Sequence, residues 1–106
     1  MASGMRRVRR ETISASIDEE RGVFMISVAA ELAHMHPQTL RMYEARGLIA
    51  PQRSPKNTRL YSQRDVELLR RIQQLTAEGL NLAGVERVLA LERRVAELER
   101  RLGKTA

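Results

Sequence analysis

The spacing of apolar side chains, together with the residues at segment boundaries, predicts two short helices early in the chain. Val28 and Leu32 lie one helical turn apart in residues 27–34, after a short apolar entry over residues 23–26. Ser27 is expected to cap this helix, because a serine hydroxyl can accept a hydrogen bond from the free backbone amides of a first turn. Alanines beside the apolar positions would let another helix pack closely.

A second short helix is predicted over residues 36–46. Pro37 is tolerated at a first helical position, where its missing N–H leaves no bond unmade. Gly47 suits the left-handed residue that ends a helix, and Leu40 should face the first helix. The two helices would then be joined by a tight turn at Met35 and His36.

Residues 48–61 change to a pattern that fits a two-stranded hairpin. The apolar run that begins at Leu48 gives way to a turn-rich stretch over residues 53–58, after which the chain continues as Arg59, Leu60 and Tyr61. Proline, serine and asparagine in such a stretch are typical of turns. The tip of this hairpin is expected to be basic.

The next segment predicts a longer helix. Ser62 and Asp65 have the spacing of a capping box, with aspartate in the usual glutamate place, and Gly79 is expected to end the helix that they begin. The stripe that should face the core comprises Val66, Leu69, Ile72 and Leu75.

Asn81 can cap a last helix that carries two apolar stripes. The stripe of Leu82, Val85 and Leu89 should close the domain core. The other stripe alternates steps of three and four residues, as in a coiled-coil seam, and we expect it to bind a second copy of the chain. Alternatively, this stripe folds back and packs against its own domain. The expected dimerisation residues are Val88, Leu91, Val95, Leu98 and Leu102.

Together these elements predict a mostly α fold, a winged helix-turn-helix with a small β-hairpin wing and a C-terminal dimerisation helix. Residues 1–22 are expected to form a flexible arm, residues 23–92 the winged domain, and residues 85–106 the dimerisation helix, which overlaps the end of the domain. The arm mixes small polar residues with opposed charges. Its arginines could touch phosphates, or it could be an ordinary disordered tail.

Composition narrows the chemistry. The chain has no cysteine, which excludes thiolate metal sites, disulfides and cysteine nucleophiles. No apolar run approaches the roughly 18 residues of a membrane span, and no export signal follows the N-terminal arginines, so a soluble, non-exported protein is expected. The sequence holds no Ser/His/Asp set or glycine-rich phosphate loop, which argues against an enzyme. His34 and His36 have no further ligands to complete a metal site.

Positive charge is concentrated in one part of the chain. The formal net charge is +6, and residues 36–64 hold six basic side chains and one acidic side chain. This concentration favours a polyanionic partner over a merely solvated surface. The alternative is a coiled-coil interaction module whose basic segment is only solvated.

The second helix and the hairpin offer the side chains that binding to duplex DNA requires. A helix can enter the major groove while a hairpin reaches the phosphates, and arginine, glutamine, threonine and tyrosine can bond phosphates or base edges. Tyr43 could instead be a core aromatic, and His36 a cap. The candidates are His36, Gln38, Thr39, Arg41 and Tyr43 in the recognition helix, and Arg53, Lys56, Arg59 and Tyr61 in the wing.

Several runs of the sequence resemble the MerR family of transcription regulators. They are SVAAELA at residues 27–33, TLRMYE at 39–44, GLI at 47–49 and RLYS at 59–62, and the resemblance covers residues 24–92. Within that family, HPQTLR at residues 36–41 and GLNLAGV at residues 79–85 are similar to the heat-shock repressors. This second match is the more specific one.

The resemblance implies a homodimer that binds an inverted-repeat operator and represses chaperone genes, with the DnaK chaperone as co-repressor. It also implies a cytoplasmic, nucleoid-associated protein of a bacterium. By the same resemblance, Arg41, Tyr43 and Arg59 would contact DNA. No motif places the surface that DnaK would bind. Another MerR-type regulator, without chaperone control, is the alternative.

Two features depart from the family pattern. His34 stands where the turn of such a helix-turn-helix usually has glycine, and histidine enters the left-handed region only at a cost. Relatives that sense metals or small molecules carry further C-terminal residues, whereas this chain stops at Ala106. We therefore expect no built-in effector domain, no cofactor and no small-molecule effector.

The orientation of the dimer helix is left open by its charges. Parallel pairing would place Arg94 opposite Glu99 of a second copy, whereas the family resemblance implies antiparallel helices, which would bring like charges together. Exposed ion pairs are worth at most about 1 kcal/mol each, so apolar contacts can override them.

Overall fold

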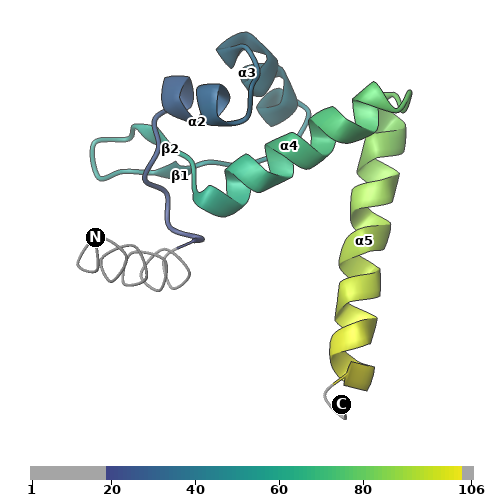
Figure 1. Ribbon diagram of the computed structural model, residues 1–106. Coiled ribbons are helices and arrows are strands. Elements are labelled where there is room, and N and C mark those ends of the chain that lie inside the picture. The colour runs from purple at the N-terminus through teal and green to yellow at the C-terminus, as the bar shows by residue number, and fades with distance from the viewer. Residues whose placement is uncertain (1–18, 104–106) are drawn as a thin grey trace, which may run out of the picture. The chain divides into compact units, whose positions relative to one another are not determined.

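The computed structural model describes residues 19–103, which divide at Arg70 and Arg71 into two compact units, residues 19–70 and residues 71–103. The predicted mostly α fold with a small hairpin is confirmed (Figure 1). Helix α4 runs from the first unit into the second. The elements, in chain order, are α2 (Ile26–Leu32), α3 (Pro37–Ala45), β1 (Gln52–Arg53), β2 (Arg59–Leu60), α4 (Gln63–Ala77) and α5 (Leu82–Gly103).

Helix α2 begins one residue earlier than its expected cap. Met25 is the N-cap, its carbonyl accepts hydrogen bonds from the amides of Val28 and Ala29, and no side chain caps the helix. The prediction that Ser27 caps it is therefore wrong, because Ser27 already lies within the first turn. At the other end, the guanidinium of Arg70 donates two hydrogen bonds, of 2.7 and 3.1 Å, to the carbonyl of Leu32.

The turn into α3 and the bounds of that helix agree closely with the sequence pattern. His34 adopts a left-handed conformation with φ of 60°, a region that histidine enters only at a cost. His36 is the N-cap, and its ring Nδ1 accepts a 3.0 Å hydrogen bond from the amide of Gln38. Gly47, with φ of 80°, follows the helix in the left-handed region, as predicted.

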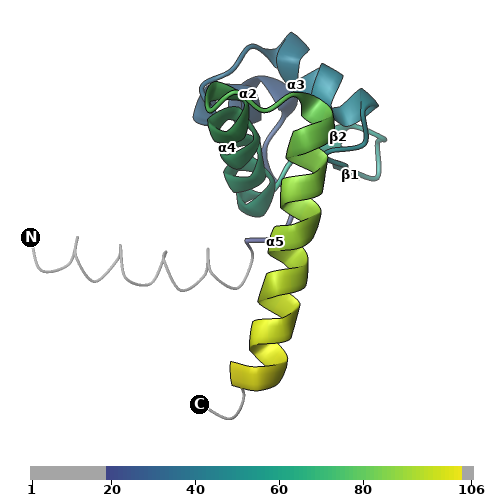
Figure 2. The ribbon, with the colours of Figure 1, turned by 90° about the vertical axis from the view of Figure 1, so that its right-hand side faces the viewer.

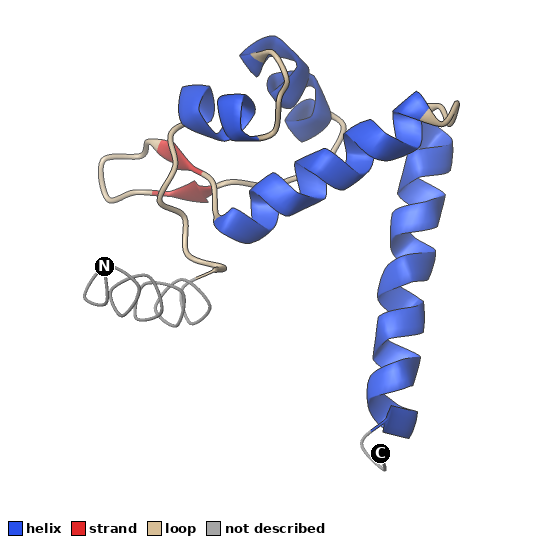
Figure 3. Cartoon of the chain, in the orientation of Figure 1, coloured by secondary structure: helices blue, strands red, loops and turns tan. Residues whose placement is uncertain are grey.

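The hairpin is shorter than the segment that predicted it. Strands β1 and β2 pair antiparallel, with Gln52 opposite Leu60 and Arg53 opposite Arg59 (Figure 3). The hydroxyl of Ser54 accepts hydrogen bonds from two amides of the connecting turn. Because the turn occupies residues 54–58, the side chains at its tip project from a small, locally bonded loop.

The chain just before α2 is bonded to the wing. The amides of Val23 and Phe24 donate to the carbonyl of Tyr61, and the amide of Tyr61 donates back to Phe24. The backbone amide of Gly22 donates a 2.7 Å hydrogen bond to the side-chain oxygen of Gln52. A Cβ at Gly22 would lie only 2.8 Å from that oxygen. Residues 19–22 of the expected arm thus belong to the first unit. The rest of that arm, residues 1–18, lies outside the described residues.

The core of the first unit forms where α2, α3 and the start of α4 meet the wing. Small alanines on α2 allow α3 to approach it closely, and the tyrosine rings and branched side chains fill the space. Its buried apolar residues are Ala29, Ala30, Ala33, Leu40, Tyr43, Ile49, Tyr61, Val66 and Leu69.

Both predicted caps of the longer helices are confirmed. Ser62 Oγ accepts from the amide of Asp65 at 3.0 Å, and a carboxylate oxygen of Asp65 accepts from the amide of Ser62 at 2.9 Å. Gly79 has φ of 105° in the turn after α4, and the side chain of Asn81 accepts from the amide of Gly84 at 2.8 Å. These reciprocal bonds satisfy amides that a helix start otherwise leaves without partners.

In the second unit, α5 is one continuous helix (Figure 2). Arg71 on α4 forms a hydrogen-bonded ion pair with Glu92 on α5. Two faces of α5 differ in exposure, as the two stripes predicted: Val85 and Leu89 are buried, whereas four apolar residues of the second stripe are exposed by 39–73%. Those four are Leu91, Val95, Leu98 and Leu102.

A single carboxylate joins the second helix to the wing. One oxygen of Glu44 on α3 accepts a 3.0 Å hydrogen bond from Arg59 on β2. The other accepts a 2.9 Å bond from the hydroxyl of Tyr61, whose ring is fully buried. Glu44 therefore fixes α3 against the wing through two hydrogen bonds.

Ser62→Ala should lower the free energy of unfolding by about 1 kcal/mol, because the amide of Asp65 loses its acceptor. Urea unfolding at a fixed protein concentration measures this loss. Ser27→Ala is the matched control and should change stability little, since Ser27 makes no cap. Equal losses in the two variants would contradict the capping box.

Glu44→Ala should lower the free energy of unfolding by about 1–3 kcal/mol, because it leaves the buried hydroxyl of Tyr61 without its acceptor. The same substitution in a Tyr61→Phe background should be milder, since no orphaned hydroxyl remains. Chemical unfolding of the four proteins gives the coupling energy. Strictly additive effects would show that the two side chains act independently.

Candidate nucleic-acid interface

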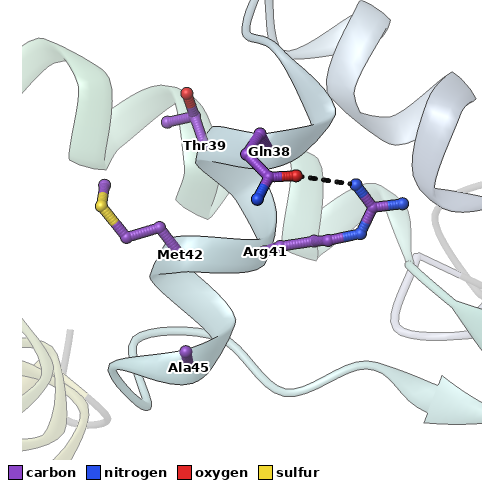
Figure 4. Close-up of a pocket in the computed structure, with 5 residues that line it drawn as sticks. All are labelled: Gln38, Thr39, Arg41, Met42 and Ala45. Carbon is purple, nitrogen blue, oxygen red and sulfur yellow. Dashed lines mark hydrogen bonds between the residues drawn. The ribbon is translucent and has the colours of Figure 1, made fainter.

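The outward face of α3 carries a short row of side chains at helical spacing. Gln38, Arg41, Met42 and Ala45 are exposed, and Thr39 beside them is half-buried. These five residues line one shallow hollow on the helix surface (Figure 4). The inward face of the same helix carries Leu40 and Tyr43, both of which are buried, so the helix separates a packing face from a free face.

Arg41 is held in place by its neighbour on the same face. Its Nη1 donates a 3.1 Å hydrogen bond to the side-chain oxygen of Gln38, drawn as a dashed line in Figure 4. The guanidinium carries several further N–H donors. Among residues 19–103, no carboxylate forms an ion pair with it. Its remaining donors are available for a guanine edge or a phosphate oxygen.

His36 lies at the start of this face. Its side chain is exposed, and Nδ1 is engaged in capping α3. The structure thus supports the capping role that the sequence allowed. Within the described part of the chain, no three His, Cys, Asp or Glu side chains are grouped so that they could hold a metal ion.

The cations of residues 36–64 fall into two groups. Arg59 is paired with Glu44, and Arg64 is paired with Glu19, whose hydrogen bond raises the pKa of the guanidinium. The other four form no ion pair with any described residue, and three of them lie on α3 or the wing. The four unpaired cations are Arg41, Arg46, Arg53 and Lys56.

The two tyrosines expected to contact DNA are core residues in the structure. Tyr43 is 4% exposed and Tyr61 is 0% exposed. Burial, and then the hydrogen bond to Glu44, raise the pKa of the Tyr61 hydroxyl above its ordinary value of 10.0, so it stays protonated and donates. A buried ring presents little surface to a duplex. Neither tyrosine ring therefore lies on the exposed face of α3 or of the wing.

Sequence reasoning missed three residues that matter here. Met42 and Ala45 share the outward face with Gln38 and Arg41, and helical spacing counted from Gln38 would have found them. In the sequence, Glu44 stands out only as the single acidic residue of the basic segment 36–64. Its role as the connection to the wing depends on which side chains the fold brings near it, and no local pattern shows that.

The chain matches known proteins over most of its described length. Residues 24–92 match the family described as MerR HTH family regulatory protein. A protein of Streptomyces coelicolor that carries the name heat shock protein HspR is 50% identical over 91 residues, which are 85% of this chain and 60% of that protein.

Two solved structures share the fold. The transcription regulator PbrR691 from Ralstonia metallidurans CH34, solved with lead(II), is 32% identical with a TM-score of 0.64, and the match covers 68% of this chain and 57% of that one. HiNmlR, a MerR family regulator that lacks the sensor domain and was solved on promoter DNA, has a TM-score of 0.58 at 24% identity, over 74% of this chain and 77% of that one.

This chain spans about 60% of the length of the HspR protein that it matches. In residues 19–103 there is no helix that is both long and apolar enough to cross a membrane. The family match covers the two short helices, the wing, α4 and the first part of α5. By this match, the chain belongs to the MerR family of helix-turn-helix regulatory proteins.

Proposed function

We propose that this protein is a sequence-specific DNA-binding repressor of heat-shock and chaperone genes. Two copies bind an inverted-repeat operator, with a chaperone of the DnaK class as co-repressor. The observation that carries the DNA-binding part is the free face of α3, where Gln38 and Arg41 are exposed, bonded to each other and unpaired with any described carboxylate.

The wing supplies the second part of the proposed interface. Arg53 donates to the backbone carbonyl of Asn57 at 3.2 Å, and Lys56 is exposed at the tip of the hairpin. Cations at such positions would bind phosphates and set the register of the helix on the duplex, without reading bases. Because Glu44 joins α3 to the wing, base contacts and phosphate contacts would be held at a fixed distance from each other.

The exposed stripe of α5 supports the homodimer. Four large apolar side chains on one helix face, exposed by 39–73%, are typical of a surface that binds another chain. Two copies joined in this way would bind both half-sites of the operator at once. Binding of one half-site raises the effective concentration of the second, and this raises the affinity.

The regulatory part of the proposal rests on the similarity to the HspR protein, which is 50% identical over 85% of this chain. Genome-wide footprinting of the bacterium, with the DnaK chaperone present and depleted, tests it. Protected inverted repeats upstream of chaperone genes that lose protection on depletion are expected. Protection that is unchanged without the chaperone would leave a DNA-binding regulator without chaperone control.

Arg41→Ala should weaken operator binding by about 5- to 150-fold, the range expected for loss of one bidentate base contact. Thermal unfolding should be nearly unchanged, since the side chain is exposed. Arg93→Ala, which removes the same charge from an exposed position of α5, is the matched control. Electrophoretic mobility shifts at one fixed salt concentration compare the three proteins. Equal affinity in Arg41→Ala and the parent protein would overturn the assigned recognition face.

Leu98→Asp should convert the dimer to monomer and weaken operator binding, because it places a charge in the apolar seam of α5. Ala96→Asp introduces the same charge at an exposed position outside that seam and should leave the dimer intact. Sedimentation velocity gives the oligomeric state of both variants. A Leu98→Asp protein that remains dimeric would show that the stripe has another role.

A further inference from the structure

We infer that Met42 reads the 5-methyl group of a thymine in the operator, beside the base that Arg41 contacts. The inference rests on the proposed function and names one base that the recognition helix distinguishes. It starts from an exposed apolar side chain that neither the core nor the proposed phosphate contacts explain. Met42 is 46% exposed on a helix whose other large apolar residues, Leu40 and Tyr43, are buried.

The surroundings of Met42 form a recess for a small apolar group. The hollow on α3 is lined by Thr39, Met42 and Ala45 together with the two polar residues Gln38 and Arg41. In Figure 4, Met42 and Thr39 lie on one side of the helix, while Gln38 and Arg41 extend to the other. Two neighbouring base pairs in the major groove can offer the same division, because thymine shows a methyl group and guanine shows two acceptors.

Charge decides between a nucleic acid and an apolar protein partner for this hollow. Arg41 on the rim of the hollow and Arg46 at the end of α3 are both exposed and form no ion pair with described residues. Unpaired cations beside a small apolar recess fit a surface that is itself anionic and carries methyl groups, as the major groove is. An apolar protein surface would leave these cations without compensation.

The hydrogen bond between Gln38 and Arg41 bears on the order of bases. It holds the guanidinium of Arg41 on one side of α3, while Met42, the next residue, projects from the other side. A side chain at position 41 and one at position 42 project about 100° apart around a helix, so they reach neighbouring base pairs and not the same one. We therefore expect the thymine to lie next to the guanine that Arg41 contacts.

The test uses duplexes chosen by the protein itself. The full chain is used to select its preferred inverted repeat from a random duplex library, and each half-site thymine is then replaced by deoxyuridine, which lacks only the methyl group. At one position per half-site, this replacement should lower the affinity about fourfold, the fold-change that corresponds to about 0.8 kcal/mol for one buried methyl group. The other thymines should show no loss.

The variant Met42→Ala should bind the thymine and deoxyuridine duplexes with equal affinity. Met25→Ala removes another exposed methionine, which is 57% exposed and lies before α2, and should keep the fourfold difference. Loss of the difference in both variants, or its persistence in Met42→Ala, would overturn the inference. So would a selected operator in which no thymine responds, and that result would leave sequence-specific binding intact. Failure to select any inverted repeat would instead remove the proposed function together with this inference.

Discussion

The geometry of the first unit depends on the Glu44 carboxylate, which is bonded at once to Arg59 and to the buried hydroxyl of Tyr61. The two bonds differ in importance. The Arg59 side chain is 44% exposed, so solvent screens that ion pair, whereas the hydroxyl of Tyr61 has no solvent to replace a lost acceptor. Without Glu44, α3 and the wing would lose the two side-chain hydrogen bonds that join them.

Ion pairs within the fold divide the cations of residues 36–64 into two groups. Arg59 and Arg64 are neutralised by the carboxylates of Glu44 and Glu19. The cations that remain unpaired among the described residues are therefore the better candidates for phosphate or base contacts. Their positions, at the outward face of α3 and along the wing, place the available charge on both elements that Glu44 connects. The unpaired cations would then set the strength of DNA binding, whereas Glu44 and its two partners would set the spacing between α3 and the wing.

The second unit consists of the last part of α4 and the long helix α5. One side of α5 is buried at Val85 and Leu89, and the ion pair between Arg71 and Glu92 joins α5 to α4. The opposite stripe remains exposed as far as Leu102. Reading an inverted repeat requires two recognition helices, so the proposed function needs this stripe as much as it needs α3.

The sequence alone determined the features that depend on neighbouring residues. The bounds of α3, the left-handed residue Gly47 after it, the capping box at Ser62 and the two stripes of α5 all follow from local hydrogen bonding or helical period. Only the tertiary structure decided which side chains are free. Tyr43 and Tyr61 are buried and Arg59 is paired with Glu44, because burial and pairing depend on residues distant in the chain. The bond from Glu44 to Tyr61 spans 17 positions, and no local pattern can report a contact of that kind.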